Sequence, residues 1–75
     1  MVYFDGVHLT ADSVTELHEF ASGCGLRREW FQDHPRHPHY DAWGRAITRR
    51  IIKHGAALVS QRELLLVANK ILDAK

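Results

Sequence analysis

Two short segments of the chain match the capping box that opens an α-helix, and they fix where helices can begin. In each, a serine is followed three residues later by a glutamate: Ser13 with Glu16, and Ser60 with Glu63. The serine hydroxyl can accept a hydrogen bond from the backbone N–H of the glutamate, whose carboxylate can accept one from the serine N–H. We therefore expect one helix to open at residue 13 and another at residue 60.

Apolar residues recur every three or four positions behind both boxes, which is the spacing of one helix face. Another such stretch lies between them, with Asp41 as its expected N-cap and Gly55 at its end. The residues expected to face inward are Val14, Leu17, Phe20 and Ala21 in the first helix, Trp43, Ala46, Ile47 and Ile51 in the second, and Leu64, Val67, Ala68 and Ile71 in the third.

A short β-prone run precedes each helix, at residues 2–4, 26–32 and 56–59. The first ends at the turn signal Asp5-Gly6, and residues 7–12 are interpreted as a loop. We expect an α/β fold in βαβαβα order, with a small three-stranded, mostly parallel sheet and helices on its faces. Strand 2–4 should lie in the middle, strand 26–32 at an edge, and strand 56–59 buried. The 75 residues, 45% of them hydrophobic, should form one compact domain over residues 1–75.

Composition excludes several classes of protein. Cys24 is the only cysteine, so neither an internal disulfide nor a zinc site of the CxxC type can form, and its thiol should be buried and inert. No apolar run reaches the roughly 18 residues of a membrane span, and the first residues do not read as a signal peptide. We therefore expect a cytoplasmic protein without membrane contact. Its small size and exposed strand edges favour a homodimer.

Residues 30–41 concentrate three of the six histidines, both prolines and two carboxylates. Because proline disfavours helix in the residue before it, His34 and His37 should be held in a stiff, extended stretch. Imidazoles held in this way are positioned to exchange protons near neutral pH or to bind a ligand. Residues 26–55 also carry seven Lys and Arg against three acids. This excess suits an anionic ligand such as a phosphate ester, although a solvated helix face explains it equally well.

The expected parallel sheet would gather the strand-to-helix loops at one edge, where helix N-termini present partial positive charge. The residues expected to act there as acid and base are His8, His39 and Asp41, and a divalent metal could be held by His8, His39 and either Asp5 or Asp41. For Asp12, Asp41 and Ser60 a capping role is favoured over chemistry. The residues expected to bind the ligand are Asp5, Asp12, Arg27, Gln32, His34, Arg36, His37, Tyr40, Ser60 and Arg62.

A series of short motifs runs along nearly the whole chain: Asp5 after the opening strand, His8-Leu9-Thr10-Ala11-Asp12, Glu16-Leu17-His18, Phe20-Ala21, Gly25-Leu26, Trp30-Phe31-Gln32, His39-Tyr40-Asp41, Gly55-Ala56 and Arg62-Glu63-Leu64. In this combination the sequence resembles a family of small bacterial and phage proteins known as a domain of unknown function, numbered four-zero-three-one. The resemblance implies a fold type and a bacterial or phage source. It carries no activity with it.

Three functions fit the residues at this edge. The first is binding and hydrolysis of a phosphate-bearing small molecule, a nucleotide or phosphodiester, by the two imidazoles as acid and base or as metal ligands. The second is sequestration of a nucleotide without turnover, with Trp30, Phe31 or Tyr40 stacking on the base, although a core position is favoured for Trp30 and Phe31. The third is nucleic-acid binding by the basic second helix, through Arg45, Arg49, Arg50 and Lys53. Hydrolysis ranks slightly ahead of sequestration, and nucleic-acid binding ranks third.

Overall fold

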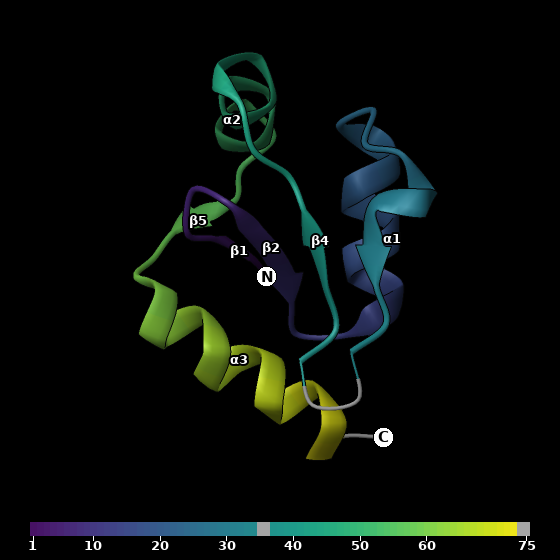
Figure 1. Ribbon diagram of the computed structural model, residues 1–75, viewed down its shortest axis with the longest axis vertical. Coiled ribbons are helices and arrows are strands. Elements are labelled where there is room, and N and C mark those ends of the chain that lie inside the picture. The colour runs from purple at the N-terminus through teal and green to yellow at the C-terminus, as the bar shows by residue number, and fades with distance from the viewer. Residues whose placement is uncertain (35–36, 74–75) are drawn as a thin grey trace.

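The computed structural model of the chain describes residues 1–34 and 37–73, with side chains as far as residue 69. Within these residues it has three α-helices and a five-stranded mixed sheet (Figure 1). None of the helices in this part of the chain has the length and apolar character needed to cross a lipid bilayer. The helices are α1 (Val14–Gly23), α2 (Arg45–Lys53) and α3 (Gln61–Asp73), a 3₁₀ turn η1 covers Arg28–Trp30, and the strands are β1 (Val2–Phe4), β2 (His8–Ala11), β3 (Phe31–Gln32), β4 (His39–Asp41) and β5 (Ala57–Leu58).

The strand order is β3-β4-β2-β1-β5, and only the β1–β5 pair is parallel. The α/β class with helices on both faces is confirmed, but the expected three-stranded, mostly parallel βαβαβα sheet is wrong. The central strand is β2 and not β1. Residues 8–11 were expected to lie in a loop but form that strand. The chain therefore returns antiparallel to β1, where a crossover to a parallel strand was expected.

The turn at Asp5 explains this difference. Its Oδ1 atom accepts hydrogen bonds from the backbone N–H groups of Val7 (2.8 Å) and His8 (2.6 Å). Gly6 between them has a φ of 103°, which a residue with a side chain rarely adopts. These contacts reverse the chain within three residues, so that β2 returns along β1 with Phe4 opposite Leu9.

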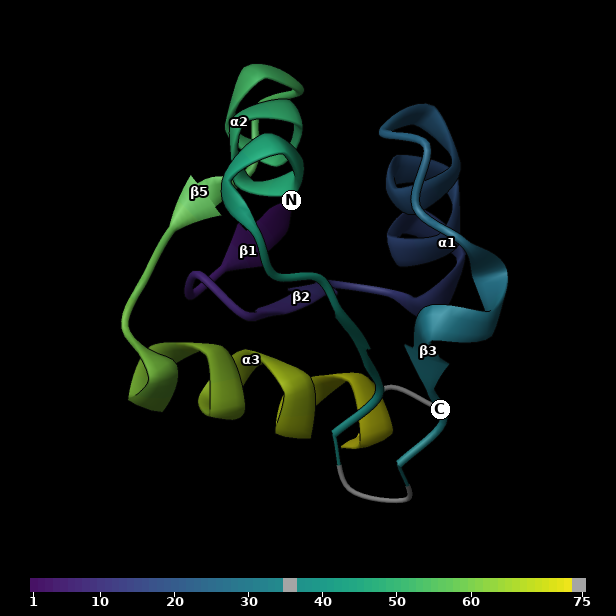
Figure 2. The same ribbon diagram turned by 45° about the horizontal axis from the view of Figure 1, so that its top comes forward.

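The sheet separates two layers of helices, with α1 and α2 on one face and α3 on the other (Figure 2). Side chains alternate along each strand, so Phe4 and Leu9 point into the core that the sheet shares with α1 and α2. His8 and Thr10 point to the opposite face, on which α3 packs with Leu64 and other apolar side chains. One face of β2 therefore builds the core, and the other is available for polar groups.

Both serines cap their helices, but only the second capping box is reciprocal, because the carboxylate of Glu16 binds the N-terminal ammonium group. Ser13 accepts from the N–H of Glu16 at 3.1 Å, and Ser60 and Glu63 exchange two hydrogen bonds of 3.2 Å. The second helix begins differently, because α2 starts at Arg45 behind a glycine that offers no side-chain cap. The expected N-cap Asp41 is wrong: this residue lies in β4, where its carboxylate is not used to cap a helix.

Three further expectations are wrong because a strand or helix is shorter than its sequence pattern predicts. Of residues 26–32 only the last two form a strand, because Arg28–Trp30 closes a 3₁₀ turn first. Trp43 was expected in the core, but it precedes the late start of α2 and is 71% exposed. Strand β5 is a two-residue edge strand with Leu58 68% exposed, so the buried strand is wrong as well. Cys24 is buried as expected.

Candidate metal centre on the face of the sheet

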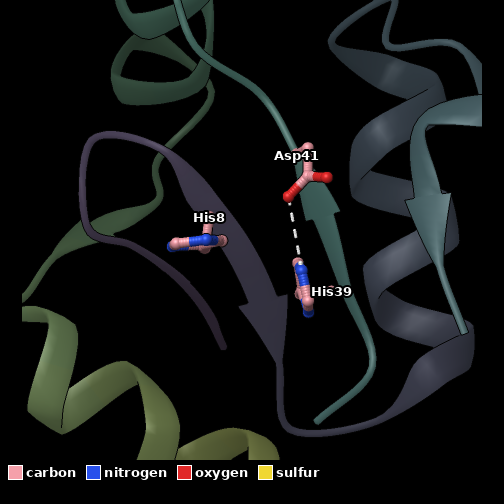
Figure 3. Close-up of side chains that lie close together, drawn as sticks. All are labelled: His8, His39 and Asp41. Carbon is pink, nitrogen blue, oxygen red and sulfur yellow. Dashed lines mark ion pairs between the residues drawn. The ribbon is translucent and has the colours of Figure 1, made fainter. Parts of the chain in front are cut away.

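His8, His39 and Asp41 lie together on the face of the sheet to which α3 belongs (Figure 3). The antiparallel register places His8 directly opposite Asp41, and His39 two residues before Asp41 shares the same face. One potential ligand atom from each residue lies within 4.8 Å of the other two. The imidazole rings of His8 and His39 meet edge to face, with centroids 5.1 Å apart. Strand pairing therefore preassembles two imidazoles and a carboxylate.

Each imidazole is held by an acceptor at its Nδ1 atom. Nδ1 of His8 lies 2.9 Å from Oδ2 of Asp5, and Nδ1 of His39 lies 2.6 Å from the backbone carbonyl oxygen of His37. A carboxylate and a carbonyl can only accept, so both Nδ1 atoms carry the proton, and a neutral ring keeps its lone pair on Nε2. Histidines that ligate metals usually have such an acceptor on the second nitrogen.

Asp5 is ionised in this arrangement. Burial by itself would raise its pKa, but hydrogen bonds from the backbone and ring of His8 and from the N–H of Val7 outweigh it. The net result is a pKa below the ordinary value of 3.8. A charged Asp5 can therefore fix the tautomer of His8 throughout the neutral pH range.

The contact between His39 and Asp41 requires a positive charge. Nε2 of His39 lies 3.3 Å from Oδ1 of Asp41. Since the Nδ1 proton points to the carbonyl of His37, a neutral ring would present its Nε2 lone pair to a carboxylate oxygen, and two acceptors repel each other. The contact becomes attractive when Nε2 is protonated or when a cation binds both atoms. The side chains are 15% and 41% exposed, so a small ion can reach them.

A pocket of about 190 Å³ opens beside His8 and His39, between the sheet and α3. Nδ1 of His37 is buried near this pocket and has no hydrogen-bond partner in the part of the chain that the structure describes. Buried polar atoms normally bond to protein, water or ligand, so His37 has a hydrogen bond to offer. The lining consists of Asp5, His8, His37, His39, Gln61, Leu64 and Leu65.

A second hollow, of about 370 Å³, adjoins the other side of the cluster and contains both His39 and Asp41. It also includes Gln32, Asp33 and His34, and Gln32 lies beside His39 in the β3–β4 pairing. The ring of His34 stacks on that of His37, with centroids 4.1 Å apart. The histidine-rich stretch of residues 30–41 therefore contributes lining residues to both hollows next to the cluster.

Several residues predicted for the site lie elsewhere. Asp12 is at the opposite end of β2 from His8, where it binds the N-terminal ammonium group and the hydroxyl of Tyr3. Tyr40 points into the core on the other face, because it alternates with His39 and Asp41. Arg27 is exposed and 3.9 Å from Glu29, Ser60 caps α3, Arg62 is exposed in the first turn of α3, and Arg36 lies outside the described residues.

Asp5 also has a different place from that predicted. It was grouped with His8 and His39 as a metal ligand, but its Oδ2 atom lies behind the ring of His8, on the Nδ1 side. Asp41 takes the third position because it opposes His8 across the strand pair. The structure thus brings together His8, His39 and Asp41 by strand register, and not by convergence of loops at the edge of a parallel sheet.

Two side chains of α3 that line the first hollow, and one contact of the partly buried His18, were not predicted from the sequence. Gln61, between Ser60 and Glu63 of the second capping box, lines the pocket from the first turn of α3. Leu65 lies outside the apolar stripe of α3 and lines the pocket, but the equally off-stripe Leu66 does not, so this pattern could not have identified it. Nδ1 of His18 lies 2.7 Å from the hydroxyl of Tyr40, a contact that no local pattern predicts.

Among the described residues, those lining the two hollows include no lysine or arginine. Four of the seven basic residues in the middle of the chain lie instead on the exposed surface of α2, as Arg45, Arg49, Arg50 and Lys53. Among the described lining residues, the groups that could carry positive charge next to a bound anion are the imidazoles. Arg27, expected to bind the ligand, lies outside both hollows, and Arg36 belongs to the residues that the structure does not describe.

The fold and the cluster define a small α/β protein with a candidate metal centre built on paired antiparallel strands. The family described as "protein of unknown function (DUF4031)" matches residues 5–71, and the chain belongs to this family. This confirms the resemblance seen in the sequence motifs. The matched segment includes all three residues of the cluster and Asp5 behind them. No curated protein and no solved structure gives a match.

Proposed function

We propose that the protein binds a divalent transition-metal ion through Nε2 of His8, Nε2 of His39 and the carboxylate of Asp41, and uses it to bind and hydrolyse a phosphate ester. The contact between His39 and Asp41 carries this proposal, because it needs a positive charge between two acceptors. Two imidazoles and one carboxylate suit Zn²⁺, Mn²⁺, Fe²⁺ or Co²⁺. Three protein ligands leave coordination positions open for water and a substrate oxygen.

Such an ion would neutralise phosphate oxygens and make bound water a nucleophile near neutral pH. The protein residues around it have separate tasks. Asp5 and the carbonyl of His37 hold the two rings with Nε2 towards the ion, and this orientation is fixed before any ligand arrives. The described lining residues include no arginine or lysine, and a metal held by the cluster would supply positive charge for an anionic ligand there.

Hydrolysis adds water across a P–O bond: the water oxygen bonds to phosphorus, the ester oxygen leaves, and that oxygen takes up a proton. His37 is suited to provide this proton when it is protonated. Its Nδ1 atom is buried at the pocket and has no partner within the described residues. In this role His37 acts as a general acid, for which histidine is the commonest residue.

Titration calorimetry of the metal-free protein with Zn²⁺ and Mn²⁺ tests the metal centre. We expect a single ion per chain, and a loss of affinity in His8→Ala, His39→Ala and Asp41→Asn larger than the roughly 10- to 100-fold caused by loss of an outer partner. His54→Ala and Asp12→Asn are matched controls, since both side chains are exposed and remote from the cluster. Unchanged metal affinity in all three cluster variants would contradict the proposal.

Release of p-nitrophenol from p-nitrophenyl phosphate and bis(p-nitrophenyl) phosphate, with and without the metal that binds, tests hydrolysis. We expect release only with metal, and its loss in Asp41→Asn but not in Asp12→Asn. Retention of an intact phosphate ligand, recovered after denaturation, would instead identify a protein that sequesters its ligand at the same centre. A metal-bound protein that neither binds nor cleaves phosphate compounds would overturn the proposed function.

A further inference from the structure

A third hollow, of about 330 Å³, adjoins the metal centre at Asp41. Figure 3 shows Asp41 at the end of the cluster from which the chain continues to α2. Two residues further on, Trp43 lines the hollow, together with Trp30 from η1 and Ile47 from α2. Asp41 and Gln32 line both this hollow and the one that contains His39, so the two are adjacent.

The two tryptophans in this hollow differ in their packing. Trp30 is half-buried and packs against the hydrophobic core, which fixes one apolar wall. Trp43 is 71% exposed, and its indole is the largest exposed apolar side chain among the described residues. Exposed single apolar residues are common, but a wall of two indoles and an isoleucine with polar groups at one end is typical of a ligand pocket. A flat, unsaturated ring is the shape that stacks best on such a wall.

The polar side chains that line this hollow indicate which hydrogen-bonding groups a ring bound there would have. Glu29 and Asp41 offer carboxylates, which only accept hydrogen bonds, and Gln32 offers an amide that can donate and accept. No described lining residue is a lysine or arginine. A ring with N–H donors therefore fits, whereas an anionic ring would be repelled. Heterocycles with an exocyclic amino group, such as adenine, guanine and cytosine, combine a stacking face with these donors.

We propose, building on the proposed function, that the phosphate ester is a nucleotide: its base stacks on Trp43 beside Trp30, and its phosphate lies on the metal held by His8, His39 and Asp41. Asp41 stands where the two parts of the ligand meet, since it belongs to the cluster and to the aromatic hollow. The amino group of the base donates to Glu29 or to the side-chain oxygen of Gln32. The aromatic hollow is a subsite for the base that is separate from the metal ligands.

Calorimetry on the metal-loaded protein, with adenosine monophosphate and ribose 5-phosphate as matched ligands, tests this subsite. We expect the nucleotide to bind at least about tenfold more tightly, which is the size of one base–aromatic stack. Trp43→Ala should remove that difference and leave metal stoichiometry and ribose 5-phosphate affinity unchanged, while Trp43→Phe should retain most of it. Leu58→Ala, which alters another exposed apolar residue far along the chain, should have no effect.

The amino group is tested with inosine monophosphate, which has a carbonyl oxygen in its place and should bind more weakly than adenosine monophosphate. Equal binding of nucleotide and ribose 5-phosphate, or an equal loss of both in Trp43→Ala, would overturn the base subsite. Adenosine, which has no phosphate to bind the metal, tests the base subsite independently of the metal centre. Even in His8→Ala it should quench tryptophan fluorescence, and the quenching should be lost in the double variant with Trp43→Ala; absence of quenching in the wild type counts against the subsite.

Discussion

The two faces of the sheet are built from the same strands and behave as opposites. On the side of α1 and α2, Leu9 and Tyr40 are almost fully buried in an apolar core. On the side of α3, their immediate neighbours His8, His39 and Asp41 are partly exposed and form the polar cluster. Alternation along two short strands thus separates the residues that stabilise the protein from those that can act chemically. Substitutions at adjacent positions should have different consequences.

The largest difference is expected between Leu9→Ala and His8→Ala. Leu9 is fully buried in the central strand, so its truncation should cost about 2–5 kcal/mol of the free energy of unfolding. His8→Ala in the metal-free protein should cost much less, since the ring is partly exposed. Urea denaturation measures both, with Leu9→Val as a milder control. Equal destabilisation by the two alanine variants would remove the distinction between the faces.

A bound metal ion should stabilise the folded protein only through the cluster on the α3 side of the sheet. At a free Zn²⁺ concentration of about 100 times its Kd, binding to the folded chain should add roughly 2.7 kcal/mol. Thermal unfolding should show this as a higher Tm that a chelator reverses. Asp41→Asn should abolish the increase, whereas Leu9→Val should lower the Tm but leave the increase intact. A Zn²⁺ effect that persists in Asp41→Asn would place the ion elsewhere.

Asp5→Asn tests the support behind the cluster. The side-chain oxygen of the asparagine can still accept hydrogen bonds from the backbone N–H groups of the turn. It carries no negative charge and therefore binds Nδ1 of His8 more weakly, so metal affinity should fall about 10- to 100-fold. The wild-type pKa of Asp5 lies below 3.8, and its stabilising effect is present above that value and is lost as pH falls through the lower folded-state pKa. Urea denaturation below about pH 4 should therefore show a steeper loss of stability in the wild type than in Asp5→Asn.

His18 provides the smallest expected effect, on the apolar face. Burial lowers its pKa, and the charge of Arg28 lowers it further. The unfolded chain therefore binds the proton more readily, so the stability due to neutral His18 is complete above its ordinary value of 6.5 and is lost as pH falls through the folded-state pKa. His18→Asn should flatten the decrease in unfolding free energy between about pH 7 and pH 5. An identical pH profile in both proteins would contradict this.

The parts of the fold that depend on neighbouring residues could be predicted from the sequence. Both serine caps and the helices behind them were found, because a cap involves residues only three positions apart. Residues 8–11 alternate between polar and apolar positions, but four residues are too few to distinguish a strand from a loop without its partner. The Asp5-Gly6 turn was recognised, yet not that it returns the chain antiparallel to β1. Strand register is a long-range property that periodicity does not contain.

The candidate site was predicted in part for the same reason. His8 and His39 could be selected by residue chemistry, and the structure places their rings 5.1 Å apart. Asp41 was assigned mainly to a helix cap, and its place opposite His8 follows only from the β2–β4 pairing. The positions of Asp12 and Tyr40 could not be predicted, since each depends on which end or face of a strand the residue occupies.

The carboxylate of Asp5 divides its two oxygens between the backbone and a side chain. Oδ1 accepts hydrogen bonds from the backbone N–H groups of Val7 and His8, and Oδ2 accepts one from Nδ1 of the His8 ring. Any cation drawn to Nε2 polarises that imidazole and, through the shared carboxyl group, the two amides. The NMR chemical shifts of the Val7 and His8 amide protons should therefore change when an ion binds. They would report metal binding without substitution of the residues that would hold the ion.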